Sequence, residues 1–411
     1  MRSRVGTGLV VVLVGLSVTL VLGVAEKSPC AGSGFDARRY RDLCYSDIEP
    51  LYGTESLQGN RLPYIDECTP GPNGICDEYP VLTMYTMRIA AWPVRTFVGF
   101  FYANVLLLVA AAFAAAYSLY RLAGRLALYF ALAPTLLIYG FVNWDLLAVA
   151  FATTATYAFV RRRNTLAGVL LGLGAAAKFY PALLVIPFAA ERLRERDRTG
   201  AIDVFWWSVV GWLAVDLPFI ILARHPWSTF FRFNAHRTTD FDSLWYVACN
   251  QLHGGPCAHT NTVNDLSLLA FVGAVAIVWF LKVRRHPDTP RWQLAFPILV
   301  AFLLSNKVYS PQYSLWLLPW FALVLPDLRW FLAFELTDVA VFVTRFSWFG
   351  SISDPGNEWT HAMRFSYFEW AIVARAAVLV GCAVTFLLRA PPGLPEEVPA
   401  SGEIATEAAA A

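Results

Sequence analysis

The residues best suited to chemistry lie in six short segments of the chain, which are expected to gather at one edge of the membrane. Together the segments hold carboxylates, cations and amides: Asp47, Glu78, Asn143 with Asp145, Lys178, His236 and Arg237 with Asp240, and Lys307. Ionisable groups at membrane depth cost roughly 2.5 to 3.5 kcal/mol on insertion scales, so those that are retained tend to serve a function. Carboxylates on one side and cations on the other suit the transfer of a group away from a phosphate.

Several of these residues also fit purely structural roles. Asn143 or Asp145 equally fits an N-cap of the helix expected to begin there, because Asn and Asp are good N-caps. Lys178 also fits an interfacial lysine that reaches the lipid headgroups, with Pro181 in the first turn of the next helix. An aromatic belt at the membrane interface accounts for most of the nearby rings, which are Trp144, Tyr180, Tyr309, Tyr313 and Trp316.

The composition indicates that lipid surrounds most of the chain. Of the 411 residues, 57% are hydrophobic and 15% are charged, and the mean hydropathy is +0.50. These values are typical of an all-α polytopic membrane protein, because backbone groups in lipid find partners only within helices. The formal net charge of +2, with Arg and Lys residues between the apolar stretches, argues against a nucleic-acid partner.

Twelve apolar stretches predict about twelve transmembrane helices. They lie near 8–25, 97–118, 126–140, 145–160, 165–177, 180–190, 203–222, 265–281, 293–305, 311–326, 330–347 and 367–388. The two short stretches within 165–190 also fit one broken helix or a re-entrant pair, and the sidedness of everything downstream depends on that choice. The first stretch fits either a cleaved signal peptide or an uncleaved anchor, and its length favours the anchor.

The distribution of basic residues predicts which ends of the helices face the cytoplasm. Under the twelve-helix count, the following basic residues and ranges all lie on one side of the membrane, the cytoplasmic side: Arg2, Arg4, Arg121, Arg125, 161–163, 192–198, 282–285, Arg291, Arg329 and Arg389. The membrane domain then spans 1–390, and its two long loops, 26–95 and 223–264, lie outside. The first loop is too long for a mere connector and is expected to carry function. The tail 391–411, rich in Pro, Ala and Glu, is expected to be disordered in the cytoplasm.

Six of the seven cysteines fall in segments predicted to lie outside the cell. The candidate disulfides are Cys30 with Cys44, Cys68 with Cys76, and Cys249 with Cys257. Turn-rich sequences within the last two pairs allow the chain to double back. Disulfides persist in oxidising compartments, so the cysteines support the orientation from charge. The cysteine and histidine spacing does not support a zinc site, and no metal is expected.

Beyond these patterns, several runs of the sequence resemble the actinobacterial branch of glycosyltransferase family 87. The runs are Cys-Tyr-Ser-Asp-Ile-Glu-Pro-Leu-Tyr at 44–52, Leu-Pro-Tyr-Ile-Asp at 62–66, Glu-Tyr-Pro-Val-Leu-Thr at 78–83, Asn-Trp-Asp at 143–145, Ala-Gly-Val-Leu-Leu-Gly-Leu-Gly-Ala-Ala-Ala-Lys-Phe-Tyr-Pro at 167–181 and Asn-Lys-Val-Tyr-Ser-Pro-Gln-Tyr at 306–313. The resemblance extends from about residue 40 to 320. The three cysteine pairs and the insertion from Glu67 to Asp77 depart from the characterised mannosyltransferases of that family.

The resemblance implies a GT-C fold, in which a membrane protein takes a sugar from a polyprenyl-phosphate lipid on the outer face of the cell membrane. The best-known members are polyprenyl-phosphomannose-dependent α-mannosyltransferases, and related GT-C enzymes use arabinose donors. In this fold an acidic residue of the first outer loop acts as the base, and Asp47 is the matching position. The expected activity is inverting transfer of a hexose, foremost mannose, to an extracytoplasmic glycolipid or glycan acceptor.

Roles for the other polar residues follow from their charge and from this chemistry. The donor phosphate is expected to meet Lys178, His236, Arg237 and Lys307. Hydroxyl groups of the sugar or the acceptor are expected to bind Glu78, Tyr79, Asn143, Asp145, Tyr309 and Gln312. No cofactor is expected, because the cations supply the positive charge that Mg²⁺ supplies to nucleotide sugars.

Two other classes of protein are weighed against the enzyme. A transporter or lipid flippase usually carries its ionisable groups near the bilayer midplane and often contains an inverted repeat, and neither is evident in the sequence. A structural membrane protein without catalysis does not explain six polar clusters at one depth, although a degenerate relative of the enzymes would look much the same. Release of polyprenyl phosphate from a donor separates the enzyme from both.

Overall fold

The computed structural model describes residues 2–32, 38–69, 75–353, 363–390 and 392, and within these ranges the chain contains helices and no strands. Apart from residue 392, the tail 391–411 lies outside the described residues, as does the middle of the insertion 67–77. The α-helices are α1 (Arg2–Lys27), α2 (Arg38–Arg41), α3 (Ile48–Thr54), α4 (Val81–Ala91), α5 (Phe97–Ala123), α6 (Leu128–Ala131), α7 (Pro134–Tyr139), α8 (Asp145–Val160), α9 (Asn164–Ala177), α10 (Val185–Arg194), α11 (Arg198–Leu222), α12 (Arg224–Trp227), α13 (Thr229–His236), α14 (Leu244–His253), α15 (Thr260–Arg285), α16 (Ala295–Ser305), α17 (Leu318–Leu323), α18 (Leu328–Ser353) and α20 (Phe365–Leu388). Short 3₁₀ helices join some of them: η1 (Ser28–Cys30), η2 (Gly124–Ala127), η3 (Tyr180–Leu184), η4 (Arg291–Leu294) and η5 (Pro311–Leu317).

In the described part of the chain, five helical segments are long and apolar enough to cross a membrane: Gly6–Cys30, Phe97–Ala131, Arg198–Leu222, Thr260–Arg285 and Phe365–Leu388. Shorter apolar helices cover Asp145–Val160, Asn164–Ala177 and Arg291–Ser305. Large apolar side chains are exposed along the long helices, for example Ile221 on α11 at 70% and Leu269 on α15 at 67%. Such surfaces are stable in lipid and unfavourable in water, so the chain is a multi-pass membrane protein.

A helical segment lies at each of the twelve apolar stretches, but several stretches are more broken than expected. The stretch 126–140 is divided among η2, α6 and α7, and the stretch 311–326 between η5 and α17. Prolines in the first turns of α7, η3 and α17 account for the breaks, because proline is tolerated at the start of a helix and disfavoured in its interior. The region 165–190 holds two helices, α9 and α10, with a break at Lys178. How many segments cross the bilayer stays a prediction.

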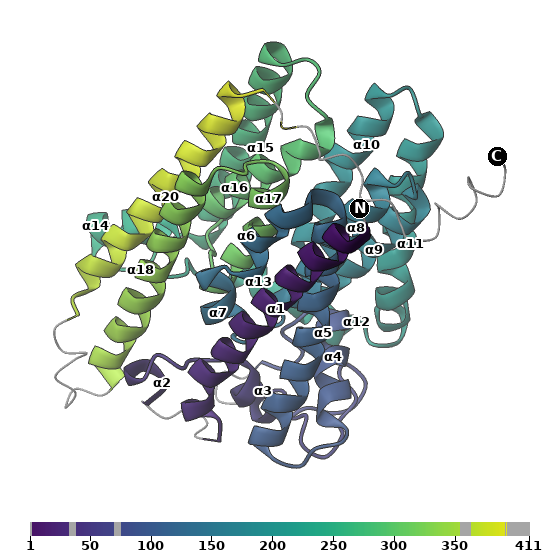
Figure 1. Cartoon of the computed structure of the whole chain (residues 1–411). Coiled ribbons are helices and arrows are strands. Elements are labelled where there is room, and N and C mark those ends of the chain that lie inside the picture. Colours follow the sequence, from purple (N-terminus) through teal and green to yellow (C-terminus); the bar gives the residue numbers. More distant parts are fainter. Residues whose placement is uncertain (1, 33–37, 70–74, 354–362, 391, 393–411) are drawn as a thin grey trace.

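The two long loops contain helices that the hydropathy pattern did not indicate. The first holds α2, α3 and α4, and the second holds α12, α13 and α14. Figure 1 shows α2 and α3 beside the end of α1, at one end of the bundle. These short helices are too polar or too brief for a hydropathy window, yet they carry or adjoin most of the residues described below.

Glycines allow α9 and α11 to pack with their backbones close together. A Cβ atom at Gly172 would overlap the Ser208 carbonyl, and one at Gly211 would lie 2.6 Å from the Val169 carbonyl oxygen. Close approach of this kind is typical of membrane helices, where packing replaces the hydrophobic effect as the source of helix association. The tight α9–α11 pair therefore fixes the end of α9, where Lys178 lies.

The basic residues predicted for the cytoplasmic side lie in segments that contact one another. Arg389 pairs with Asp327 at 2.7 Å, and the Lys282 ammonium donates to the Arg389 carbonyl at 2.6 Å. The backbone N–H of Arg291 donates to the carboxylate of Glu191. These contacts join α10 to η4, and the ends of α15 and α20 to the start of α18, so the basic residues of these segments lie at neighbouring helix ends.

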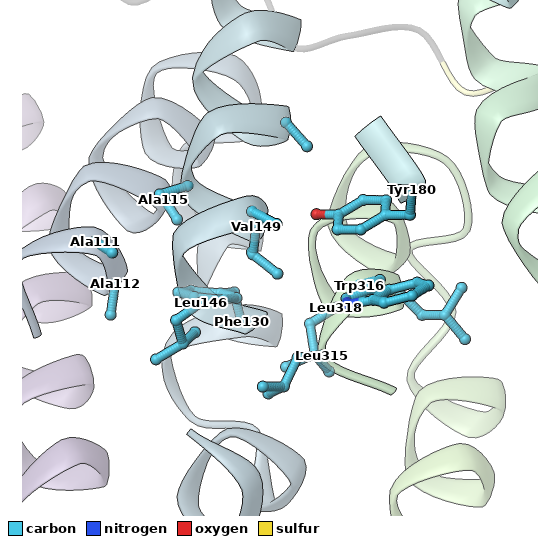
Figure 2. Packing of buried hydrophobic residues seen from close by; sticks show 14 of the residues in the cluster. Ala111, Ala112, Ala115, Phe130, Leu146, Val149, Tyr180, Leu315, Trp316 and Leu318 are labelled. Carbon is cyan, nitrogen blue, oxygen red and sulfur yellow. The ribbon is translucent and has the colours of Figure 1, made fainter. Parts of the chain in front are cut away.

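Apolar side chains fill the interior between α5, α8 and η5 (Figure 2). The α5 helix contributes small side chains such as Ala111 and Ala115, which leave room for Leu146 of α8. Tyr180 and Trp316 stack with their ring centroids 4.4 Å apart. These packed helices hold the polar segments next to them in place, which are the α7–α8 connection and η5.

Candidate active site

A polar cavity of about 550 Å³ lies where the six polar segments meet. The predicted residues that line it are Asp47, Glu78, Tyr79, Asn143, Lys178, Arg237, Lys307 and Gln312. They belong to turns and helix ends: the segments before α3 and α4, the α7–α8 connection, the break after α9, the end of α13 and the α16–η5 connection. The helices thus serve as supports, and the loops between them supply the chemistry.

Asp47 precedes α3, but its side chain faces the cavity instead of capping the helix. Its backbone N–H donates to the Val142 carbonyl at 2.8 Å, which ties this loop to the α7–α8 connection. The Tyr45 hydroxyl donates to Oδ1 at 2.5 Å, and the Asn143 amide donates to Oδ2 at 3.0 Å. Burial raises the pKa of Asp47, and the two hydrogen bonds offset part of that rise because they favour the charged form. Asp47 is therefore an oriented carboxylate with more affinity for a proton than a solvated aspartate.

Asp145 lies behind the cavity wall and neutralises Lys178. Its fully buried carboxylate accepts from the Trp316 indole at 2.7 Å and from the Lys178 ammonium at 3.3 Å. Burial by itself lowers the pKa of Lys178, but the Asp145 charge and other nearby groups outweigh it, and the pKa ends above its usual value. The Asp145 side chain does not line the cavity, and its predicted sugar contact stays a prediction. The alternative as a helix cap is wrong, since α8 begins without a side-chain cap.

Two further predicted site residues lie away from the cavity. His236 is exposed at the end of α13, and its Nδ1 lies 2.7 Å from the Arg232 carbonyl of the same helix. Tyr309 is buried, with its hydroxyl 3.1 Å from Ser314 Oγ and the Arg375 guanidinium 3.8 Å from its ring centroid. Their neighbours Arg237, Val308 and Ser310 line the cavity instead, and the predicted roles of His236 and Tyr309 stay predictions.

Arg237 and Lys307 are the cations of the cavity that are least neutralised. Arg237 makes only a loose contact, 3.7 Å, with Asp240. The Lys307 ammonium donates to the Ala235 carbonyl at 3.1 Å and has no ion-pair partner among the described residues. Burial lowers the pKa of Lys307, and the neighbouring positive charge of Arg237 lowers it further. Two adjacent positive charges with little compensation favour an anion at this side of the cavity.

Tyr45 and Arg345 line the cavity although the sequence analysis gave neither a role. Arg345 belongs to α18, pairs with Asp242 and lies 4.0 Å from Asp240. A usable signal was present, because an arginine inside an apolar helix is costly and seldom kept without a function. Tyr45 lies within the motif around Asp47, but its role depends on a hydrogen bond that the sequence does not specify.

A second, apolar cavity of about 370 Å³ adjoins the polar one. The two share one wall, formed by Tyr79, Pro80, Phe179, Phe230 and Phe231. The remaining walls come from α4, α9, η3, α10, α11 and α12. The sequence analysis missed this cavity, because its lining positions are indistinguishable from ordinary membrane-helix residues.

The cysteines near the site form disulfides. The bonds are Cys30–Cys44, Cys68–Cys76 and Cys249–Cys257, the same pairs that the spacing suggested. Two of them adjoin cavity residues, since Cys44 precedes Tyr45 and Cys76 lies two residues before Glu78. Within the described ranges, no three His, Cys, Asp or Glu side chains are grouped as metal ligands.

Comparison with known proteins identifies the family. No curated protein matches the sequence. The crystal structure of ArnT from Cupriavidus metallidurans bound to undecaprenyl phosphate is similar, with a TM-score of 0.44 and 14% sequence identity over 92% of this chain and 76% of that chain. The family model of glycosyltransferase family 87 matches residues 79–311, which are more than half of this chain and include Tyr79, Asn143, Lys178, Arg237 and Lys307. The chain is therefore a member of glycosyltransferase family 87.

Proposed function

We propose that this glycosyltransferase transfers a hexose, most readily mannose, from a polyprenyl-phosphate donor to a glycolipid or glycan acceptor outside the cytoplasm, with inversion at the anomeric carbon. The observation that carries the proposal is the shared wall between an apolar cavity and a polar cavity that contains both a buried carboxylate and uncompensated cations. A lipid-linked sugar phosphate likewise has an apolar chain joined to an anionic phosphate and a polar sugar, so its parts match the apolar cavity, the cations and the polar cavity. The choice of mannose rests on the resemblance to the mannosyltransferases of this family.

The donor would lie across the shared wall. Its lipid chain suits the apolar cavity, where burial of each CH₂ group contributes about 0.8 kcal/mol. Its phosphate suits Arg237 and Lys307, because these cations lack the close carboxylate that neutralises Lys178. Lys178, which Asp145 neutralises, then serves mainly to hold that carboxylate in place.

Asp47 is the proposed base. Its carboxylate accepts the proton of the acceptor hydroxyl while that oxygen forms a bond to the anomeric carbon and the bond from that carbon to the phosphate oxygen breaks. The phosphate leaves from the opposite face, which inverts the configuration, and the positive charges of Arg237 and Lys307 stabilise it. Tyr45 and Asn143 keep the Asp47 oxygens in place for this transfer.

The sugar and acceptor would contact the polar groups that remain in the cavity. Glu78, Tyr79, Asn143 and Gln312 all line it. Tyr79 also receives a hydrogen bond from the Asn143 amide at 2.8 Å, so its ring and hydroxyl are fixed. These side chains offer both donors and acceptors to sugar hydroxyls.

The disulfides support an extracytoplasmic site. Cys30–Cys44 and Cys68–Cys76 lie directly beside segments that enter the cavity, and the Cys257 N–H donates to Thr239 next to Asp240. Disulfides persist in oxidising compartments and are rare in the cytoplasm. A cavity framed by disulfides is therefore expected to open on the outer side of the membrane.

The decisive experiment incubates the purified, detergent-solubilised protein with radiolabelled polyprenyl-phosphomannose and an extract of cell-envelope lipids. Label in a new glycolipid, with stoichiometric release of polyprenyl phosphate, supports the proposal. Asp47→Asn should abolish the transfer, and Asp265→Asn, at an exposed aspartate on α15, is the matched control. Failure to release polyprenyl phosphate from mannose, glucose or arabinose donors would overturn the proposal and favour transport.

A further inference from the structure

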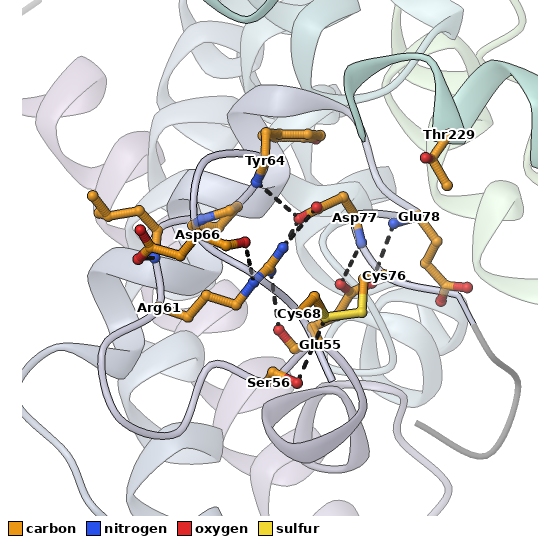
Figure 3. Close-up of polar contacts among 12 residues, drawn as sticks. Glu55, Ser56, Arg61, Tyr64, Asp66, Cys68, Cys76, Asp77, Glu78 and Thr229 are labelled. Atoms are coloured by element: carbon orange, nitrogen blue, oxygen red, sulfur yellow. Dashed lines mark hydrogen bonds and ion pairs between the residues drawn. A yellow bond between two sulfur atoms is a disulfide. The ribbon is translucent and has the colours of Figure 1, made fainter. Parts of the chain in front are cut away.

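The short segment from Asp77 to Tyr79, which leads into the polar cavity, is held at its backbone by one buried carboxylate. Glu55 accepts hydrogen bonds from two successive backbone amides, those of Asp77 at 2.7 Å and Glu78 at 3.2 Å (Figure 3). Asp77 has a φ of +57°, a left-handed conformation that residues other than glycine adopt only where their surroundings hold them. The backbone that enters the polar cavity is therefore fixed at both amides.

A buried ion pair fixes the same segment through the Asp77 side chain. Arg61 forms two hydrogen bonds with the Asp77 carboxylate, at 3.1 and 2.7 Å, and both side chains are buried. The Tyr64 N–H donates to this carboxylate at 3.2 Å, and the Tyr64 hydroxyl donates to the Tyr79 carbonyl at 2.6 Å. A bidentate pair fixes geometry as well as charge, and breaking one when it is buried is costly.

The Cys68–Cys76 disulfide tethers the residue directly before Asp77. Next to it, the Ser56 hydroxyl donates to the Thr69 carbonyl at 2.7 Å. The bond ties Cys76, the neighbour of Asp77, to Cys68 and so limits the positions that the Asp77 backbone can take.

The Glu78 carboxylate is the group that this rigid segment presents to the cavity. Its backbone is fixed, but no described residue donates a hydrogen bond to its carboxylate. Figure 3 shows the side chain turned away from the Glu55–Arg61 network, on the side where Thr229 of α13 lies. A half-buried carboxylate without a protein partner is suited to accept hydrogen bonds from a ligand.

The position of Glu78 favours the transferred sugar as that ligand. The next residue, Tyr79, belongs to the wall shared by the two cavities, so Glu78 lies beside their junction. Burial and the Asp47 charge raise the pKa of Glu78 to about 7, while Arg237 and Lys178 limit the rise. The charges of Asp47, the proposed base, and of Arg237, at the proposed phosphate site, both act on the Glu78 carboxyl group. The transferred sugar has to lie between the base and the phosphate.

We propose that Glu78 determines donor-sugar specificity by accepting hydrogen bonds from hydroxyl groups of the transferred sugar, and that Glu55, Arg61 and Asp77 are positioning residues for it. The inference deepens the proposed function and rests on it. The ligand class is a neutral hydroxylated sugar on a lipid phosphate. If the segment were only structural, its loss would lower the stability of the fold but would not change how strongly kcat/KM depends on each hydroxyl group of the donor sugar.

The first test measures kcat/KM for polyprenyl-phosphomannose and for its monodeoxy analogues at C2, C3, C4 and C6. In the unaltered protein, removing a hydroxyl that binds Glu78 should lower kcat/KM roughly tenfold or more, as for hydrogen bonds to charged groups. In Glu78→Ala this penalty should disappear at one or two positions and persist at the others. Unchanged penalties at every position would overturn the inference.

The second test separates positioning from stability with two disulfides of equal sequence separation. The pair Cys68→Ser/Cys76→Ser should reduce the same deoxy-sugar penalties as Glu78→Ala, and Glu55→Gln should do so more weakly. The pair Cys249→Ser/Cys257→Ser removes a disulfide of α14 and should leave the penalties unchanged. Equal behaviour of the two double variants would show that the Cys68–Cys76 disulfide has no positioning role.

The two proposals fail in different ways. If Asp47-dependent transfer is present but deoxy penalties do not respond to Glu78, the specificity inference is wrong and the proposed function stands. If no donor yields transfer with any variant, the proposed function itself is wrong. Thermal unfolding of each purified variant excludes those that fail to fold, and Glu78→Gln provides a variant of nearly unchanged size.

Discussion

Asp47 and Glu78 are two carboxylates of one cavity, and the protein holds them in opposite ways. The Asp47 side chain is fixed, because Tyr45 donates to one oxygen and Asn143 to the other. The Glu78 side chain has no such donor among the described residues, and its backbone is fixed instead through Glu55. Burial raises the pKa of both groups, but only Asp47 receives hydrogen bonds that offset the rise.

The difference suits the two chemical tasks that we propose for these groups. A general base has to present one oxygen in a fixed direction and remain ionised until it receives a proton. A group that recognises hydroxyl groups needs a fixed backbone position and oxygen lone pairs that no protein donor occupies. Holding the side chain serves the first task, and holding the backbone serves the second. The comparison therefore predicts that changes around Asp47 affect turnover, whereas changes around Glu78 affect the choice and affinity of the donor.

The largest expected effect is that of Asp47→Asn. The amide cannot accept the proton, so kcat should fall by roughly 10²- to 10⁴-fold, the range typical of general base catalysis. Donor affinity, measured by equilibrium binding of labelled polyprenyl-phosphomannose, should remain nearly unchanged. A variant that loses binding but keeps kcat would assign Asp47 a positioning role and remove the distinction between the two carboxylates.

Tyr45→Phe should reduce kcat at pH 7 by roughly tenfold, because it removes a hydrogen bond to a charged group. The Tyr45 hydroxyl lowers the pKa of Asp47, so its loss raises that pKa further. The acid limb of the kcat profile should then move to higher pH, since the base must lose its proton before it acts. A lower kcat with an unmoved acid limb would mean that Tyr45 only shapes the cavity.

Glu78→Gln should change kcat/KM by a smaller factor and alter its pH dependence. The pKa of Glu78 is about 7, so the carboxyl is protonated below that pH and becomes a full acceptor above it. In the unaltered protein, kcat/KM for the donor should rise through this range, and the variant should lose that inflection. Retention of the inflection in Glu78→Gln would assign it to another group.

The sequence was sufficient to predict a helical membrane protein and the segments that converge on the site. Hydropathy identifies apolar helices directly, and a carboxylate or cation next to such a helix is conspicuous because its burial is costly. Lys178 and Lys307 could be found in this way, whereas Asp47 was singled out mainly by the family resemblance. The cysteine spacing also suggested the pairs that form disulfides.

The directions of individual side chains could not be predicted. Asn143 and Asp145 are two residues apart, yet Asn143 faces the cavity. Asp145 lies behind the cavity wall and pairs with Lys178. The Glu55 network escaped prediction for a related reason, since it depends on a left-handed Asp77 and on backbone amides that carry no sequence signature. The apolar cavity is invisible in the sequence, because the residues around it have the same composition as any lipid-facing surface.

The smallest expected effect compares two adjacent residues at the end of α13. His236 is exposed and lies against its own helix, whereas Arg237 lines the polar cavity. His236→Gln should therefore leave the donor KM within about twofold, a change typical of surface substitutions, while Arg237→Gln should raise it roughly tenfold through loss of a charge-assisted contact. Measuring KM for both variants at two salt concentrations sharpens the comparison, because only a charge that meets the phosphate should lose its effect as salt increases. A similar rise in KM for His236→Gln would mean that the donor extends along the outer face of α13, and that the phosphate site is wider than the Arg237–Lys307 pair.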